Sequence, residues 1–258
     1  LSDSAYTMTM DVTAVNDAPT AGNNTVTTNE DTNHVFTSSE FNFSDIDGDS
    51  LTQIQITALE SVGTLQYDTT GRENWIDVTA DQLITAAHID AGRLRFVPDP
   101  NDNGSSYDNF SFKVHDGTVL SDSAYTMTMD VTAVNDAPTA GNNTVTTNED
   151  TNHVFTSSEF NFSDIDGDSL NQIQITSLES VGTLQYDTTG SENWTDITAD
   201  QLITAAHIDA GRLRFVPDPN DNGSSYDNFS FKVHDGTVLS DSVYTMTLDV
   251  IAVNDAPI

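Results

Sequence analysis

The chain has 258 residues, enough for one large domain or two ordinary ones, and carries 41 Asp and Glu against 7 Lys and Arg, a formal net charge of −34. This charge argues against binding to nucleic acids and to anionic membrane surfaces, because contacts with phosphates need basic side chains. The absence of Cys excludes a disulfide scaffold, a Cys-ligated zinc site and thiol catalysis.

The rest of the composition predicts a folded protein of an extracellular kind. Aromatic and β-branched residues recur too regularly for a disordered acidic chain, so bound divalent cations are the natural explanation of the acidity. No apolar run approaches the ~20 residues needed to span a membrane, and no signal peptide is visible. The pattern starts and stops within a repeat, so we expect a segment of a longer protein.

A repeat of 119 residues organises the chain, because the segment that begins at Leu1 recurs at Leu120 and Leu239. The predicted parts are 1–19, the last strand and linker of a preceding repeat; 20–138, the first full repeat; and 139–258, the second. The two full repeats differ at eight positions, namely Thr52/Asn171, Ala58/Ser177, Arg72/Ser191, Ile76/Thr195, Val78/Ile197, Ala124/Val243, Met129/Leu248 and Thr132/Ile251. Near-identical copies favour a function that scales with copy number, such as length.

Each repeat predicts seven short strands separated by turns, the pattern of a Greek-key β-sandwich. In the first repeat we expect strands at 24–28, 34–43, 51–59, 64–67, 93–97, 109–115 and 124–134. Leu51, Ile54, Ile56 and Leu59 are the expected inward positions of the third strand, and a kink is expected near Ser38. Residues 79–84, which begin with a Thr suited to an N-cap, predict one short helical turn. The fold class is therefore all-β, with two sandwiches in an end-to-end rod.

Following the strands up and down separates the carboxylates into two sets at opposite ends of each domain. Where two repeats meet, we expect the lower set of the first and the upper set of the second to gather around the linker. The residues of that predicted joint are Glu30, Asp99, Asp102, Asn135, Asp136, Asp164, Asp166, Asp168 and Asp235. The first linker predicts a second, incomplete site with Asn16, Asp17, Asp45, Asp47, Asp49 and Asp116.

So many carboxylates would repel one another unless a cation neutralised them. Ca²⁺ accepts six to eight oxygen ligands in flexible geometry, which suits Asp, Glu, Asn and backbone carbonyls. We therefore expect several Ca²⁺ ions at the joints between repeats. The run from Asp45 to Ile56 is no EF-hand, because Ser50 replaces the required Gly and Ile56 the bidentate Glu.

The linker V-N-D-A-P, the turn N-E-D, the loop D-I-D-G-D and the turn V-H-D-G together resemble the cadherin-like tandem repeats of giant calcium-dependent, RTX-type bacterial adhesins. The resemblance covers essentially the whole chain and occurs twice. It implies a seven-stranded sandwich, Ca²⁺ that stiffens the joints, and a role in projecting a terminal binding module from the cell surface for adhesion and biofilm formation. It also implies a secreted parent protein, exported by type I secretion.

Other signals have two interpretations. His34, His88 and His115 are scattered without ligand spacing, which favours structural roles over zinc. Trp75 and Trp194, with Tyr67 and Tyr107, either form a weak sugar-binding surface or close the sandwich. No catalytic motif is present, and carboxylates crowded around Ca²⁺ are held ionised, so we expect no enzyme.

The sequence therefore predicts a monomeric, calcium-rigidified spacer whose partners are neighbouring repeats of the same chain. The rival hypotheses are a carbohydrate-binding module and a homophilic adhesion module.

Overall fold

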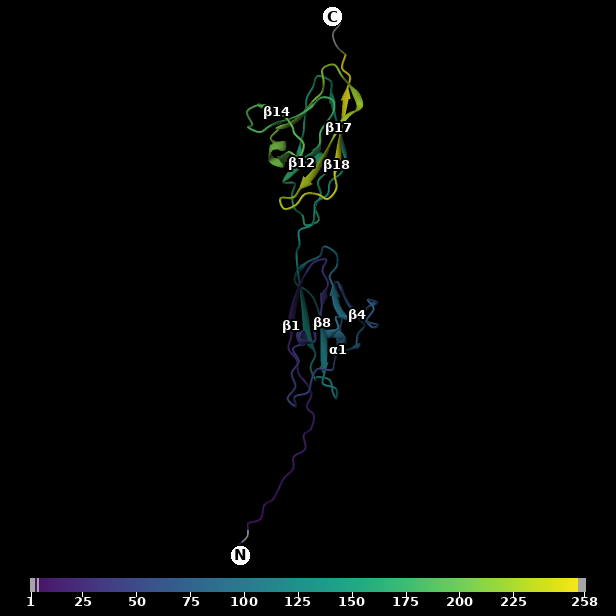
Figure 1. Ribbon diagram of the computed structural model, residues 1–258, viewed down its shortest axis with the longest axis vertical. Coiled ribbons are helices and arrows are strands. Elements are labelled where there is room, and N and C mark those ends of the chain that lie inside the picture. Colours follow the sequence, from purple (N-terminus) through teal and green to yellow (C-terminus); the bar gives the residue numbers. More distant parts are fainter. Residues whose placement is uncertain (1–2, 4, 255–258) are drawn as a thin grey trace. The chain divides into compact units, whose positions relative to one another are not determined.

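The computed structural model describes residue 3 and residues 5–254, so that the predicted segment 1–19 and the second repeat lie partly outside the described residues at their ends. The chain divides into two compact units, Leu1–Val134 and Asn135–Ile258 (Figure 1).

In unit 1, a five-stranded sheet runs in the order β1-β9-β8-β3-β6. Its strands are β1 (Asn24–Asn29), β9 (Tyr125–Thr132), β8 (Gly104–His115), β3 (Gln53–Ala58) and β6 (Leu83–Thr85). The edge strand β1 pairs in parallel with β9, whereas the remaining pairs are antiparallel. The chain therefore enters and leaves this sheet along neighbouring strands.

The second sheet of unit 1 has four strands in the order β2-β7-β4-β5. They are β2 (His34–Val35), β7 (Leu94–Val97), β4 (Thr64–Asp68) and β5 (Trp75–Asp77). Two short helices complete the unit, the 3₁₀ helix η1 (Ser38–Phe41) and α1 (Ala86–Asp90).

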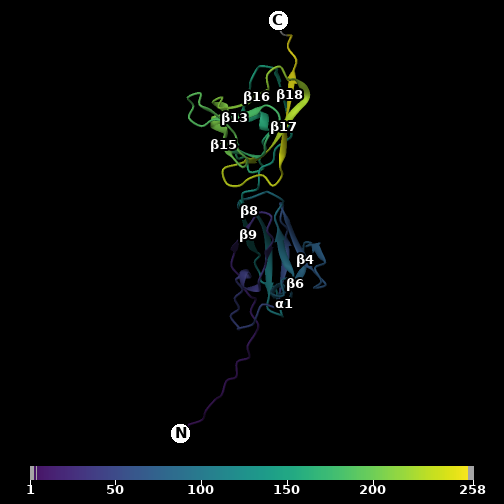
Figure 2. The ribbon, with the colours of Figure 1, turned by 45° about the horizontal axis from the view of Figure 1, so that its top comes forward.

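Unit 2 repeats this architecture element for element (Figure 2). Its five-stranded sheet contains β10 (Asn143–Asn148), β18 (Tyr244–Ile251), β17 (Gly223–His234), β12 (Gln172–Ser177) and β15 (Leu202–Thr204). Its four-stranded sheet contains β11 (His153–Val154), β16 (Leu213–Val216), β13 (Thr183–Asp187) and β14 (Trp194–Asp196). The helices are η2 (Ser157–Phe160) and α2 (Ala205–Asp209).

The core of each unit lies between its two sheets, because successive side chains of a strand point to opposite faces. Phe110 and Phe112 of β8 pack edge-to-face against Phe36 and Phe41, respectively, and all four rings are fully buried. Aromatic pairs of this kind stabilise the fold by roughly 0.5–1.5 kcal/mol beyond the contribution of the apolar area that they bury. The alternation of β9 places Met127 on the same inner face.

The predicted all-β fold with two tandem sandwiches is confirmed, because each unit consists of two packed sheets. The strand count was wrong, since each unit has nine strands instead of seven. The two extra strands, β5 and β6, have only three residues each, and neither has a clear apolar alternation in the sequence. Leu59 is 41% exposed, because a register shift between Ile56 and Ala58 ends the inward alternation of β3.

The helical turn predicted at residues 79–84 was also wrong. Asp81 has a φ of +62°, which a right-handed helix cannot accommodate, and β6 pairs with β3 directly afterwards. The helix begins instead at Ala86, where the Thr85 hydroxyl accepts a hydrogen bond from the His88 N–H. The kink expected near Ser38 is confirmed as η1, which ends the pairing of β2 after Val35.

Residues 5–15 repeat the sequence 124–134 without repeating its structure. Residues 5–15 form no strand in the described chain and appear in Figure 1 as an extended purple trace. Met8 is 86% exposed, whereas its counterpart Met127 in β9 is fully buried. The same local sequence therefore becomes a strand only where partner strands are present.

Candidate metal centre

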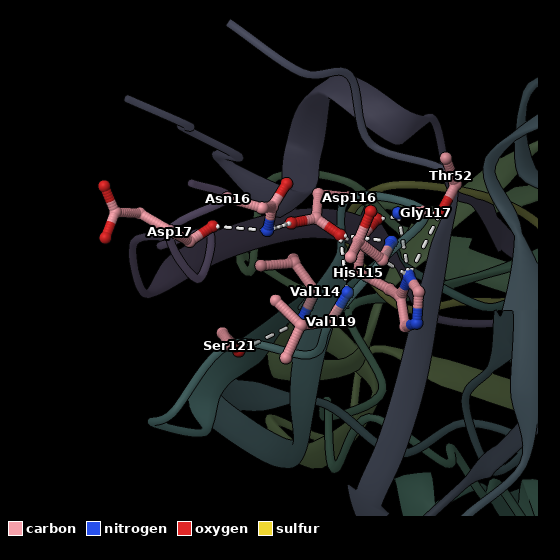
Figure 3. A network of polar contacts seen from close by, with 10 residues as sticks. Asn16, Asp17, Thr52, Val114, His115, Asp116, Gly117, Val119 and Ser121 are labelled. Atoms are coloured by element: carbon pink, nitrogen blue, oxygen red, sulfur yellow. Dashed lines mark hydrogen bonds and ion pairs between the residues drawn. The ribbon is translucent and has the colours of Figure 1, made fainter. Parts of the chain in front are cut away.

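The candidate site of unit 1 lies where the N-terminal linker meets the turn after β8. The Asn16 amide donates to a carboxylate oxygen of Asp116 at 3.0 Å and to the Asp17 carbonyl at 2.9 Å (Figure 3). The Asp17 N–H donates to the Asp47 carboxylate at 2.7 Å. The structure thus brings together linker and loop residues that lie 30 to 100 positions apart in the sequence.

Asp45 organises the loop that presents these oxygens. Its Oδ1 accepts hydrogen bonds from the N–H groups of Asp47 at 2.8 Å and Asp49 at 3.2 Å. Gly48, with a φ of +85°, allows the backbone to turn within the loop. The other oxygen, Oδ2, is buried and has no hydrogen-bond partner among the residues that the structure describes. Burying a carboxylate oxygen without a hydrogen-bond donor costs free energy. This oxygen is therefore a candidate to bind a cation at the loop.

Asp116 is the most strongly held carboxylate of the site and is only 7% exposed. The Asn16 amide and the N–H groups of Val119 and Thr118 lower the pKa of Asp116 to about 2 and outweigh its burial. His115 lies on the flank, where its Nδ1 accepts the Gly117 N–H at 2.8 Å. The carboxylate is therefore ionised over the whole physiological range of pH.

Unit 2 carries the same arrangement on the second linker. Asn135 donates to Asp235 at 2.9 Å, and the Asp136 N–H donates to Asp166 at 2.7 Å. Asp164 Oδ1 accepts hydrogen bonds from the N–H groups of Asp166 and Asp168, while its Oδ2 is buried and has no partner within the described part of the chain. Burial raises the pKa of Asp235, but the Asn135 amide and the following backbone N–H groups outweigh it and lower the pKa overall.

Glu30, at the opposite end of the five-stranded sheet of unit 1, is already engaged within its own domain. It is 2% exposed, and its two carboxylate oxygens accept the Val134 N–H at 2.5 Å and the Asn103 amide at 2.9 Å. Glu30 therefore fixes the backbone just before the second linker. Its partner Asn103 was missed by the sequence reasoning, which singled out only the acids of that loop.

Asp99 and Asp102 lie near Glu30, in the loop between β7 and β8. The Tyr107 hydroxyl accepts the Asp99 N–H at 3.3 Å and donates to Asp102 at 3.1 Å. Burial, together with the nearby carboxylates of Asp102 and Asp99, raises the pKa of Tyr107 to about 12, so the phenol keeps its proton. Glu30, Asp99 and Asp102 belong to unit 1, and the other six residues of the predicted joint belong to unit 2.

The chemistry of the donors fits Ca²⁺, since every candidate ligand is a carboxylate or amide oxygen. Among residues 3 and 5–254, however, no three His, Asp or Glu side chains converge as they would directly around an ion. An ion at Asp45 or Asp164 would therefore need Asn or backbone oxygens, or a small closure of the loop, to complete its coordination.

The histidines and aromatic residues that the sequence singled out make contacts within their own domain. His34 contacts Glu40 at 3.1 Å, and His88 hydrogen-bonds the hydroxyl of Tyr67, which is buried in the core. Tyr67 is thus unavailable for the predicted sugar-binding surface. Trp75 lies on the outside of the four-stranded sheet with the Arg95 guanidinium 3.9 Å above its ring, an arrangement that the sequence did not indicate.

Comparison with known proteins identifies the repeat. The family model described as a bacterial Ig domain matches residues 16–130 and again residues 135–249. No curated protein matches the chain. No helix among the described residues is long and apolar enough to cross a membrane.

Several solved structures match the chain at low sequence identity. A two-domain fragment of human protocadherin-24 is 17% identical, with 95% of this chain and 100% of that chain covered and a TM-score of 0.44. An endo-fucoidan hydrolase of glycoside hydrolase family 107 is 18% identical, with a TM-score of 0.29. That match covers 92% of this chain and 29% of the hydrolase. The titin domains Z1Z2 are 12% identical, with 93% and 100% covered and a TM-score of 0.26. None of these scores reaches 0.5, so the matches say nothing about function.

Proposed function

Because the chain belongs to the bacterial Ig domain family and carries this domain twice in tandem, we propose that it is a calcium-stiffened spacer of a large bacterial surface adhesin. Domains of this family are typical of surface proteins. The spacer would hold a terminal binding module away from the cell, in support of adhesion and biofilm formation, and would act without catalysis. The parent protein would reach the surface by type I secretion.

The observation that carries the proposal is the attachment of each linker to the domain that follows it. Asn135 and Asp136 are hydrogen-bonded to Asp235 and Asp166, beside the unpartnered Oδ2 of Asp164. A Ca²⁺ ion bound by Asp164, Asp166 and Asp235 with linker oxygens would supply positive charge to this acidic end. It would also restrict the linker backbone, because its ligands come from both the linker and the domain.

Unit 1 supports the same role from its other end. Glu30 holds the Val134 N–H, so the residue before the second linker is tied to the end of β1. Asp99 and Asp102 add carboxylates in the neighbouring loop. We infer that these groups bind cations at this end of unit 1, with Glu30 acting mainly through the backbone.

Calcium titration of matched variants tests the proposal. At a concentration 100-fold above its Kd, an ion that binds only the folded state stabilises it by about 2.7 kcal/mol. We therefore expect calcium to raise the Tm of the wild-type chain, and the double variant Asp45→Asn with Asp164→Asn to lose most of this increase and of the binding heat measured by calorimetry.

The control for that variant is Asp81→Asn with Asp200→Asn, which removes the same two charges from exposed loops. Both control positions have positive φ, at +62° and +64°, which Asn tolerates. Equal calcium responses of the two double variants would contradict the proposed site.

A further inference from the structure

A cavity on the side of each domain has no role in the proposed spacer function. In unit 1 it has a volume of about 480 Å³ and lies between the β4–β5 hairpin and the turn after α1. Its lining includes Asp68, Gly71, Glu73, Trp75, Gly92 and Arg93. The equivalent cavity of unit 2, about 450 Å³, is lined by the corresponding residues, including Trp194 and Arg212. The loop at β13 and β14 stands out from its domain in both views (Figures 1 and 2).

Strand register explains why polar side chains collect here. Asp68 pairs with Trp75, and Gln66 pairs with both Asp77 and Arg95, so these side chains share the outer face of the four-stranded sheet. The alternate residues, such as Leu65 and Phe96, are fully buried on the inner face. The outer face therefore carries an aromatic ring with charged groups around it.

Basic side chains are concentrated around this cavity. The first repeat contains four in all, and two of them, Arg93 and Arg95, flank Trp75. Arg93 donates from Nε to the Asp68 carbonyl at 2.6 Å, but no acceptor among the described residues meets its Nη1 or Nη2, the latter being enclosed. Because Gly71 has no side chain, the guanidinium is left open there; a Cβ would lie 3.7 Å from Nη1.

The acidic groups of the cavity do not neutralise Arg93. Asp68 directs its carboxylate to the N–H groups of Thr70, Gly71 and Glu73 at 2.8–2.9 Å. Both of its oxygens are therefore occupied by backbone donors. Glu73 is exposed at the rim, where its carboxylate can accept hydrogen bonds from a ligand.

We propose that this cavity binds a carboxylated sugar, the uronic acid residue of an acidic polysaccharide. The sugar ring would contact the part of Trp75 that lines the cavity, Nη1 of Arg93 would donate to the sugar carboxylate, and Glu73 would accept a hydrogen bond from a sugar hydroxyl. A carboxylate can accept a charge-assisted hydrogen bond from the open Nη1 of Arg93, whereas a neutral sugar would leave the charge of the guanidinium uncompensated.

The two domains differ at the rim, which makes them a natural comparison. Arg72 lies between the lining residues Gly71 and Glu73 in unit 1, and Ser191 replaces it in unit 2. Both side chains are exposed. An additional cation beside the cavity should strengthen binding of an anion, so unit 1 should bind the uronate more tightly than unit 2.

Tryptophan fluorescence reports each cavity separately, because the chain has two Trp residues and one lies in each cavity. Trp194→Phe leaves Trp75 as the reporter of unit 1, and Trp75→Phe leaves Trp194 as the reporter of unit 2. The probe is trigalacturonic acid, titrated with EDTA present so that the result does not depend on calcium. We expect saturable changes with Kd on the order of 1 mM and tighter binding by unit 1.

Variants then test the roles of the arginines. In the Trp194→Phe background, Arg93→Gln should weaken binding roughly tenfold or more, because it removes a charge-assisted contact. Arg72→Ser should weaken binding of the uronate by unit 1, and Ser191→Arg should strengthen its binding by unit 2, each by a few-fold. These exchanges use the residue that the other repeat already carries, so they separate binding from folding.

Three results would overturn the inference. One is the absence of any saturable fluorescence change with trigalacturonate, and another is equal binding of the corresponding neutral galactose trisaccharide. The third is unchanged affinity on exchange of Arg72 and Ser191 together with unchanged affinity of Arg93→Gln. None of these results depends on whether the calcium-stiffened spacer proves correct.

Discussion

Individual carboxylates in this acidic chain are stabilised chiefly by N–H donors. In unit 1, Asp108 accepts hydrogen bonds from the N–H groups of Ser61 and Val62, both at 2.5 Å, and thereby ties the β3–β4 turn to β8. Asp68 closes the β4–β5 hairpin in the same manner. Burying a carboxylate is costly unless it is hydrogen-bonded, and these donors offset that cost.

Acid should therefore weaken unit 1 partly through Asp68. Burial alone would raise the pKa of Asp68, but the hydrogen bonds from Thr70, Glu73 and Gly71 outweigh it and lower the pKa from 3.8 to about 2. A carboxyl whose pKa is depressed on folding stabilises the fold above its unfolded pKa, and this contribution is lost as the pH falls toward 2. We expect the Tm difference between wild type and Asp68→Asn to be largest above pH 4 and to shrink toward pH 2.

Thermal melts from pH 2 to pH 6 measure that difference. The control is Asp122→Asn, at an exposed position in the loop between β8 and β9. A difference that stays constant across this range would contradict the role assigned to Asp68.

The acids at turns were visible in the sequence, but their engagement was not. The D-I-D-G-D loop and the linker Asn-Asp pairs were predicted to meet, and Asn16, Asp17, Asp47 and Asp116 do share one network. Glu30 was predicted as a metal ligand without any sign that Val134 and Asn103 would occupy it. Such contacts depend on which loops meet in three dimensions, and alternation of residue types does not encode this.

At the scale of the strand, prediction succeeded where the apolar alternation was long. The strand β9 follows from Tyr125, Met127, Met129 and Val131, which alternate with polar residues. The short strands β5 and β6 escaped detection because pairing, and not their own pattern, makes them strands. The helix was placed wrongly because Thr79 and Thr85 offer similar N-cap signals, and only the left-handed Asp81 excludes the first.

The two copies of the β9 sequence give a matched test of context. Met8 and Met127 occupy equivalent positions, yet the first is 86% exposed and the second is fully buried. Met127→Ala should reduce the free energy of unfolding by about 2–5 kcal/mol, as expected for a large core side chain cut to Ala. Met8→Ala should change it by less than about 0.5 kcal/mol. Urea unfolding measures both.

Equal destabilisation by the two substitutions would show that residues 5–15 are packed in solution, contrary to the exposure found here.

At the scale of the whole molecule, charge and repetition act together. A net charge of −34 on 258 residues produces self-repulsion at low ionic strength, and bound cations would relieve it where carboxylates are densest. The 119-residue period means that each further repeat adds another linker of the same kind. We therefore predict that the solution dimensions of the two-domain chain depend on Ca²⁺, whereas the fold of each domain depends on its apolar core.

Small-angle X-ray scattering of the full chain, titrated with Ca²⁺ and then with chelator, measures whether Ca²⁺ stiffens the molecule. We predict that the maximum dimension increases and becomes better defined with Ca²⁺, that chelator reverses the change, and that the variant Asp45→Asn with Asp164→Asn does not respond. Scattering profiles that are the same with Ca²⁺ and with chelator would contradict a calcium-stiffened spacer.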